Sequence, residues 1–355
     1  MKKIAKLKNW YETYERKISV ASLASGFFVD ALTMQRIDAL RENLWIAGNL
    51  LLAGLCIVLL NRGKSEGAKH FWLSNLLQFS FGTLLGSVFI FYFRSATLSA
   101  TWPFLLMLLV AMLGNELYQK RYEKLAFQLS FFYFSLFSFT IFLVPLFLKN
   151  IGAEIFVLSG VVSLVLLWLF LEVLRRFARE KFIEGRTHIW VLVSLIFICI
   201  NGLYFTNLIP PIPLSMKEAG IYHSIEKSTK GNYIVEAEVR GPEKYFTLRE
   251  PIHWKQGEAL YAYTAIFSPG SLNTDIAHEW QYKDEAGEWV TATRIPLYLS
   301  GGRQGGFRTY SNKYNFTPGD WRVDVKTLRG QLIGRISFEI IVVDQIPELV
   351  PEVKK

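Results

Sequence analysis

Three cations and four glycines lie within residues 301–313, GGRQGGFRTYSNK. Guanidinium groups can bind a phosphate or carboxylate as a fork, and glycines let the backbone approach such a ligand closely. The candidate ligand-binding residues of this segment are Arg303, Arg308, Ser311 and Lys313. The segment equally fits a hairpin turn whose glycines supply positive φ angles. It does not complete a nucleotide-binding fingerprint, because the Lys-Ser/Thr pair and the strand–loop–helix setting are missing.

Two histidines are further candidates for ligand binding. His278 shares the apolar face of an alternating segment with Trp280, which is typical of a hydrogen-bonded core residue, and His223 lies in a turn-like context. Neither has metal-ligand spacing, and the sequence contains no His-Glu-x-x-His, Cys-x-x-Cys or Gly-x-Ser-x-Gly motif. We therefore predict no catalytic residue, no metal and no cofactor, and the sequence favours a non-catalytic protein over an enzyme without deciding between them.

All of these candidates except His223 lie in a region of short alternating segments, bounded by Gly, Pro, Asn and Asp, that begins near residue 232. Such alternation predicts half-buried strands. The predicted strands are 232–240, 258–267, 276–283, 288–299, 306–312, 320–327 and 331–343. About seven strands in roughly 130 residues predict an all-β domain, an immunoglobulin-like β-sandwich, with an open barrel as the alternative.

Charged and apolar residues occupy opposite faces of several predicted strands. In 320–327, apolar residues at 321, 323 and 325 alternate with Arg322, Asp324 and Lys326. In 276–283, Glu279 and Gln281 lie opposite the face that holds His278 and Trp280. We expect the charged faces to point to solvent.

The first half of the chain has a different composition. Of the 355 residues 51% are hydrophobic and 19% are charged, against about 25% charged in soluble domains. Six apolar stretches are long enough to span a bilayer. They are 43–61, 71–93, 101–118, 126–148, 154–174 and 188–209, and a weaker seventh stretch, 18–35, contains Asp30. We predict an α-helical membrane bundle of about seven transmembrane helices.

The charge distribution orients this bundle. The net charge is +9, and residues 1–216 carry all of it, with 21 Lys and Arg against 12 Asp and Glu. With seven spans and a cytoplasmic N-terminus, 17 of these cations lie on the cytoplasmic side and four on the other. This agrees with the rule that Lys and Arg stay inside. The excess therefore indicates membrane orientation, and we predict no nucleic-acid partner.

Polar residues within the predicted spans are the remaining candidates, since polar groups in a membrane are costly and often functional. They are Asp30, Asn49, Gln78, Asn115 and Asn201. One interpretation is a relay for a proton or a substrate through Asp30. The other is a structural hydrogen bond, or a position of Asp30 near the outer interface.

The predicted organisation has five parts. Residues 1–17 are a basic cytoplasmic segment, either an amphipathic helix on the inner leaflet or a solvated tail; a cleaved signal peptide is the rival interpretation. Residues 18–209 form the membrane domain and 210–219 a Pro-rich linker. Residues 220–345 form the extracytoplasmic β domain, and 346–355 a tail. Both cysteines, Cys56 and Cys199, lie in predicted spans, so the β domain has no disulfide.

Three segments resemble an uncharacterised family of bacterial multi-pass membrane proteins with a C-terminal periplasmic domain of unknown function. They are GFFVDALTMQRID at 26–38, IPPIPL at 209–214 with GIYH at 220–223, and the 303–311 loop with GDWRV at 319–323. The resemblance implies a bacterial inner (cytoplasmic) membrane protein. It implies no activity and no catalytic residue.

Together these features predict an integral inner-membrane envelope protein, N-terminus in the cytoplasm, whose periplasmic β-sandwich binds a polar ligand or partner protein without catalysis. Expected partners are the lipid bilayer and an envelope glycan, an anionic lipid or a partner membrane protein. The alternative is a membrane-embedded enzyme or transporter for a lipid-linked or small polar substrate, built around Asp30 and the neighbouring polar groups.

Overall fold

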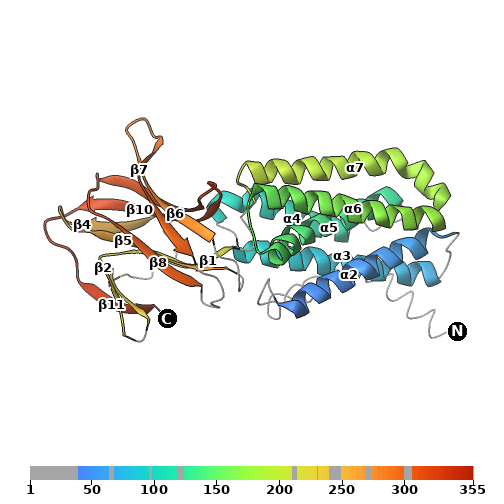
Figure 1. Ribbon diagram of the computed structural model, residues 1–355. Helices are drawn as coiled ribbons and strands as arrows, with labels where there is room; N and C mark the ends of the chain where they lie inside the picture. Colours follow the sequence, from blue (N-terminus) through green and yellow to red (C-terminus); the bar gives the residue numbers. More distant parts are fainter. Residues whose placement is uncertain are drawn as a thin grey trace. The chain divides into compact units, whose positions relative to one another are not determined.

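The computed structural model of the chain describes residues 39–63, 68–95, 98–117, 124–209, 214–229, 231–239, 249–268, 274–299 and 306–354. The chain divides at residues 209 and 210 into a helical unit and a β unit (Figure 1). The last helix ends at Phe205, shortly before the three prolines at 210, 211 and 213.

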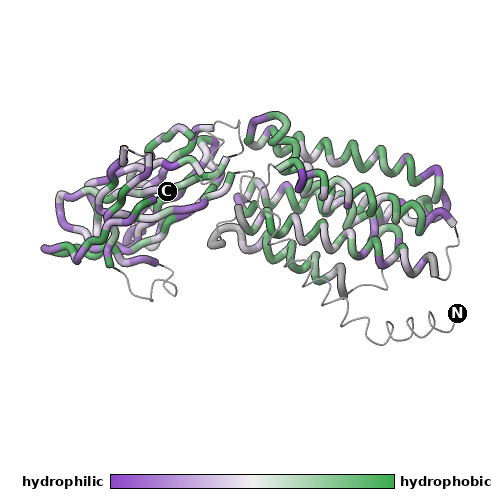
Figure 2. The backbone as a smooth tube through the Cα atoms, turned by 90° about the horizontal axis from the view of Figure 1, so that it is seen from below, coloured by the Kyte–Doolittle hydropathy of each residue, from purple (hydrophilic) through white to green (hydrophobic). Residues whose placement is uncertain are grey.

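The described part of the helical unit contains six helices. They are α2 (Leu40–Asn61), α3 (Ala68–Ser95), α4 (Leu98–Leu117), α5 (Leu125–Leu148), α6 (Ala153–Phe177) and α7 (Arg179–Phe205). All except α4 are long and apolar enough to cross a membrane, whereas the apolar part of α4, Trp102–Gly114, is shorter. Hydrophobic residues dominate the lengths of these helices in Figure 2. The predicted span at 18–35 lies outside the described residues.

Helix α5 lies at the centre of the helical unit. It packs against α2, α6 and α7, and its aromatic rings also contact α3, where Phe91 and Phe142 meet edge-to-face with centroids 5.5 Å apart. Phe132 of α5 lies 4.6 Å from Phe170 of α6, and Phe137 of α5 lies 5.7 Å from Phe197 of α7. Because its neighbours surround it, α5 is the most buried of the candidate spans.

A glycine lets α2 approach this aromatic layer closely. A Cβ atom added at Gly54 would lie 3.2 Å from Phe170 and 3.6 Å from Phe132. Such contacts leave no room for a larger side chain. Gly48, on the same helix, has open space where a Cβ would lie.

Eleven strands are described in the β unit. They are β1 (Ser215–Tyr222), β2 (Ser224–Lys227), β3 (Tyr233–Glu238), β4 (Glu250–Trp254), β5 (Leu260–Phe267), β6 (Thr274–Lys283), β7 (Trp289–Leu299), β8 (Phe307–Lys313), β9 (Gly319–Thr327), β10 (Leu332–Val342) and β11 (Leu349–Lys354). Each of the seven predicted segments contains a strand. The strands β1, β2, β4 and β11 were not predicted; β1 begins inside the predicted linker and β11 lies in the predicted tail.

These strands form three sheets. A five-stranded sheet has the order β4-β10-β9-β6-β7, and two three-stranded sheets have the orders β1-β5-β8 and β11-β3-β2. All neighbouring strands are antiparallel except β10 and β4, which are parallel. Strands β7 and β8 belong to different sheets and do not pair with each other. Residues 300–305, which separate them in the sequence, lie outside the described residues.

The β1-β5-β8 sheet lies between the other two. On one side, Leu260 and Ala262 of β5 pack with Trp280, Trp321 and other residues of the five-stranded sheet. On the other side, Tyr263 and Ala265 of β5 pack with Val235 and Ala237 of β3. Successive side chains of a strand point to opposite faces, so β5 contributes to two separate apolar cores.

The close approach at Gly54 predicts an effect on stability. Gly54→Leu should destabilise the helical unit by about 1–3 kcal/mol, because the larger side chain forces Phe170 and Phe132 to move. Gly48→Leu is the matched control and should have little effect. Thermal unfolding of the full chain in detergent micelles, followed by far-ultraviolet circular dichroism, measures both. Equal losses of stability in the two variants would contradict the packing described here.

Candidate functional site

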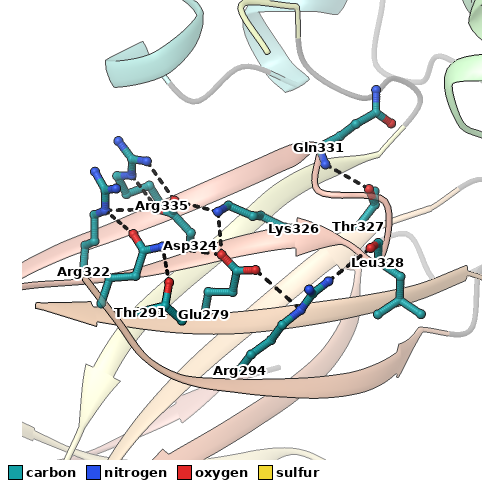
Figure 3. A network of polar contacts seen from close by, with 11 residues as sticks. Glu279, Thr291, Arg294, Arg322, Asp324, Lys326, Thr327, Leu328, Gln331 and Arg335 are labelled. Carbon is teal, nitrogen blue, oxygen red and sulfur yellow. Dashed lines mark hydrogen bonds and ion pairs between the residues drawn. The ribbon is translucent and has the colours of Figure 1, made fainter. Parts of the chain in front are cut away.

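A row of four charged residues crosses the outer face of the five-stranded sheet (Figure 3). Strand pairing places Arg294 of β7 opposite Glu279 of β6, Glu279 opposite Asp324 of β9, and Asp324 opposite Arg335 of β10. Arg335 binds Asp324 as a fork, with Nη2 2.8 Å from Oδ2. Arg294 Nε lies 3.5 Å from Glu279 Oε1. Two carboxylates thus lie side by side between two guanidinium groups.

Two more cations, Arg322 and Lys326, flank Asp324 on β9. Lys326 Nζ binds Glu279 and lies 3.6 Å from Asp324 Oδ2, so one ammonium bridges both carboxylates. Arg322 Nε donates a hydrogen bond to Gln281 Oε1 at 2.7 Å, and its guanidinium carbon lies 4.2 Å from the centre of the Trp289 ring. These contacts hold both side chains over the acids.

The contacts join six charged residues, which we call the cation cluster: Glu279, Arg294, Arg322, Asp324, Lys326 and Arg335. Its four cations against two carboxylates leave an excess of two positive charges. The Asp324 side chain is 2% exposed and that of Glu279 12%, whereas that of Arg294 is 47% exposed. The acids therefore lie beneath the cations, and the face shown to solvent is positive.

The alternation of β9 predicted that Arg322, Asp324 and Lys326 share an outward face. Arg322 and Lys326 are partly exposed there, whereas Asp324 is buried beneath them. The cluster itself was missed. Arg294 and Arg335 lie on other strands, and the pairing order β10-β9-β6-β7 brings them to the same place. The sequence showed that each of these strands carries charged residues on one face. It did not show which strands are neighbours in the sheet.

Arg308, predicted as a ligand fork, is a structural residue. It is 5% exposed, and its guanidinium donates to the carbonyl oxygens of Lys354 (2.7 Å) and Gly231 (3.0 Å). Strand β8 is thereby joined to both β11 and the β2–β3 turn. Arg303 lies outside the described residues. Gly306 has a φ of +87°, and a Cβ there would lie 2.9 Å from the Ile266 backbone, so this glycine is needed for the close approach of β8 to β5.

His278 of β6 and Ser311 of β8 lie in the core between the five-stranded sheet and the β1-β5-β8 sheet. The His278 ring nitrogens lie 2.9 Å from Ser311 Oγ and 3.0 Å from Thr264 Oγ1, and Trp280 Nε1 also donates to Ser311 Oγ. Burial lowers the pKa of His278 to about 4, so the imidazole is neutral in the fold. A His–Ser pair that solvent does not reach is a hydrogen-bonded core element, as the sequence pattern indicated for His278.

Lys313 also lies away from the cation cluster. Its Nζ is 3.3 Å from Thr293 Oγ1 of β7 and lies over the rings of Phe316 and Trp321, at 5.9 and 5.7 Å. Burial lowers its pKa below the ordinary value. Lys313 thus covers one end of the core between β7 and β8.

His223, the last candidate of the β domain, joins a cluster that the sequence did not suggest. His223 Nε2 lies 3.0 Å from Glu238 Oε1, and His253 Nδ1 lies 2.7 Å from Glu238 Oε2. The His253 backbone N–H donates to the same carboxylate. Burial by itself raises the pKa of Glu238, but the hydrogen bonds from His223 and His253 outweigh it and lower the pKa overall. The cluster links strand β3 to the edge strand β4.

The structure describes the hydrogen bonds of two of the polar residues in the predicted spans. Asn49 and Asn201 donate to carbonyl oxygens four residues earlier in their own helices, those of Trp45 and Phe197. Asp30 and the side chain of Asn115 lie outside the described residues, and Gln78 lies on α3. A pair that was not predicted does join two helices: Asn61 Nδ2 of α2 donates to Gln128 Oε1 of α5 at 2.7 Å.

Within the described ranges, no group of three or more His, Cys, Asp or Glu side chains is arranged to hold a metal ion. The cation cluster is therefore the most developed polar feature of the β unit. Its chemistry is that of an anion-binding surface, because guanidinium and ammonium groups are the usual protein partners of phosphates and carboxylates.

Comparison with known proteins supplies a domain family without a function. Residues 273–340 match the model described as "Protein of unknown function (DUF2914)". This DUF2914 domain extends from β6 into β10 and contains all six residues of the cation cluster. No curated protein matches the sequence.

Solved structures give weak matches. A β-glucosidase from Listeria innocua in complex with gluconolactone is 13% identical over 35% of this chain and 16% of that chain, with a TM-score of 0.19. A Pseudomonas fluorescens alkylpurine DNA glycosylase bound to DNA is 11% identical over 84% of this chain and 98% of that chain, with a TM-score of 0.23. Scores this low carry no inference about fold or function.

The buried His278 predicts a pH dependence of stability. The unfolded chain takes up a proton on this residue below pH 6.5, and the folded chain does so only near pH 4. The contribution of neutral His278 to the free energy of unfolding is therefore fully present above pH 6.5. About 3 kcal/mol of this free energy is lost as the pH falls from 6.5 to 4. His278→Gln should remove this part of the pH dependence.

Pulse proteolysis in urea, performed on the full chain at several pH values, measures the difference between wild type and variant. His188, exposed on α7, provides the control His188→Gln, which should keep the wild-type pH profile. A His278→Gln variant that loses stability in parallel with wild type between pH 6.5 and 4 would show that His278 is not buried as a neutral group.

Proposed function

We propose that this protein is an integral protein of the bacterial inner membrane that displays a non-catalytic anion-binding β domain in the periplasm. Five apolar helices long enough to cross a membrane support membrane residence. The excess of Lys and Arg on one side of seven predicted spans supports a cytoplasmic N-terminus. The five-stranded sheet and the β1-β5-β8 sheet pack over one apolar core, which supports an immunoglobulin-like sandwich to which the β11-β3-β2 sheet is added.

The cation cluster is the observation that carries the binding function. Three of its four cations hold the buried Asp324, and the cations still outnumber the acids by two. A surface with a fixed excess of one charge attracts ligands of the opposite charge. The ligand class that fits is a polar molecule with several negative charges, such as an anionic envelope glycan or the headgroups of an anionic lipid.

The alternative of a membrane-embedded enzyme or transporter depends on Asp30, which lies outside the described residues. The asparagines of α2 and α7 that were expected to join it bond within their own helices. We therefore propose binding by the β domain as the function.

A charge-reversal experiment tests this function. The full chain in nanodiscs of zwitterionic lipid is titrated with an anionic and a neutral polysaccharide and with anionic-lipid vesicles. We expect binding of at least one anionic probe, weakened at least tenfold by Arg294→Glu and reduced by added salt. Lys255→Glu, an equal charge change on a residue 51% exposed outside the cluster, should have little effect. Equal weakening by both variants, or no binding of any anionic probe, would refute the proposal.

A further inference from the structure

Two guanidinium groups of the cation cluster lie close together. Arg322 on β9 and Arg335 on β10 are diagonal neighbours, because Asp324, two residues after Arg322, is the register partner of Arg335. Both contact Asp324 Oδ1 through Nε, and Figure 3 shows their planar groups next to each other above the sheet. Diagonal pairs of this kind are within reach of long side chains.

Each guanidinium is held in place with donors left over. Arg322 uses Nε for its hydrogen bond to Gln281 and stacks on Trp289, and neither contact uses its two terminal amino groups. Arg335 uses Nε and Nη2 for Asp324, and neither bond uses Nη1. Among the described residues, three terminal amino groups, fixed before any ligand arrives, are therefore available to an acceptor between Arg322 and Arg335.

The charges around this pair favour a doubly negative acceptor. Burial lowers the pKa of Arg322; Asp324 opposes this effect, and the charge of Arg335 adds to it. The effect of Asp324 on the pKa of Arg322 is larger than that of Arg335, so this carboxylate holds the two guanidiniums together. The cation cluster as a whole, with four cations against two carboxylates, has an excess of two positive charges. This excess matches a phosphate monoester, which carries about −1.5 to −2 at pH 7.

The other acids on this face do not cancel that excess. Asp320 and Glu339 lie on the same two strands, on the side of Arg322 away from Asp324. Asp320 is paired with Arg249, and Glu339 is exposed to solvent, which screens its charge.

We infer that Arg322 and Arg335 form a binding site for a phosphate monoester group, flanked by Trp289. The phosphate oxygens accept hydrogen bonds from the terminal amino groups of both residues, while Asp324 keeps the two guanidiniums in position. This inference rests on the proposed anion-binding function and names the chemical group that the face takes. The group belongs to a soluble phosphomonoester or to a lipid headgroup.

Phosphate titration of the full chain in zwitterionic nanodiscs tests the inference. The probes are inorganic phosphate and methyl phosphate, with dimethyl phosphate and acetate as singly charged comparisons. We expect phosphate and methyl phosphate to bind at least tenfold more tightly than either comparison. Arg322→Lys keeps the charge and loses the fork, so it should weaken phosphate binding at least tenfold and leave binding of the anionic polysaccharide within about threefold. Lys255→Gln should change neither.

The source of the group follows from a second set of probes. Vesicles containing phosphatidic acid carry the monoester, and those containing phosphatidylglycerol carry the diester. Preference for phosphatidic acid over methyl phosphate assigns the site to a headgroup, and the reverse assigns it to a soluble ligand. Both results support the monoester site.

Three results would overturn the inference. They are the absence of phosphate binding, equal affinity for acetate, and unchanged phosphate affinity in a folded Arg322→Lys variant. If Arg322→Lys lowers the unfolding temperature, Arg335→Lys replaces it under the same criteria. If the chain binds the anionic polysaccharide but does not bind phosphate, only this site is refuted. If it binds no anionic probe at all, the proposed function is refuted as well.

Discussion

The β domain depends on a strand that must be buried on both faces. Seven of the eight residues of β5 are buried, and its alternate side chains belong to two different apolar cores. Because burial of apolar surface is the main favourable term in folding, such a strand requires a sheet on each side. The five-stranded sheet covers one face and β11-β3-β2 covers the other.

The small third sheet is held at both ends by polar contacts. At one end, Arg308 of β8 donates to the carbonyl oxygens of Gly231 and Lys354. At the other end, Glu238 of β3 accepts hydrogen bonds from His223 and His253. These hydrogen bonds limit the cost of removing the polar groups from water, although Arg308 Nε has no hydrogen-bond partner among the described residues. Residues that could have formed ligand sites are therefore used to assemble the layers.

The same layering explains where the charge of the DUF2914 domain lies. Strands β6, β9 and β10 belong to the five-stranded sheet, and the inner face of this sheet is apolar. Their charged side chains therefore lie on its outer face. Asp324 and Glu279 lie directly opposite each other there, an arrangement that is destabilising for like charges unless cations surround them. Four cations surround the two carboxylates: Arg294, Lys326, Arg322 and Arg335. Their positive charge exceeds the negative charge of the two carboxylates.

The sequence by itself determined the elements whose pattern is local. Apolar runs of about 20 residues identified the helices α2 to α7, and strict alternation identified seven strands together with the outward face of Arg322, Asp324 and Lys326. It could not identify β4 and β11, whose sequences EPIHW and LVPEVK contain proline and whose strand structure depends on partners far along the chain. It also could not show that Arg308 is buried, since a basic residue in a Gly-rich segment has the same local pattern in a ligand loop. Only the tertiary structure decided these points, because the order of strands in a sheet is set by long-range pairing. That order places Arg335 and Arg322 side by side. The spacing of residues within a single segment could not predict it.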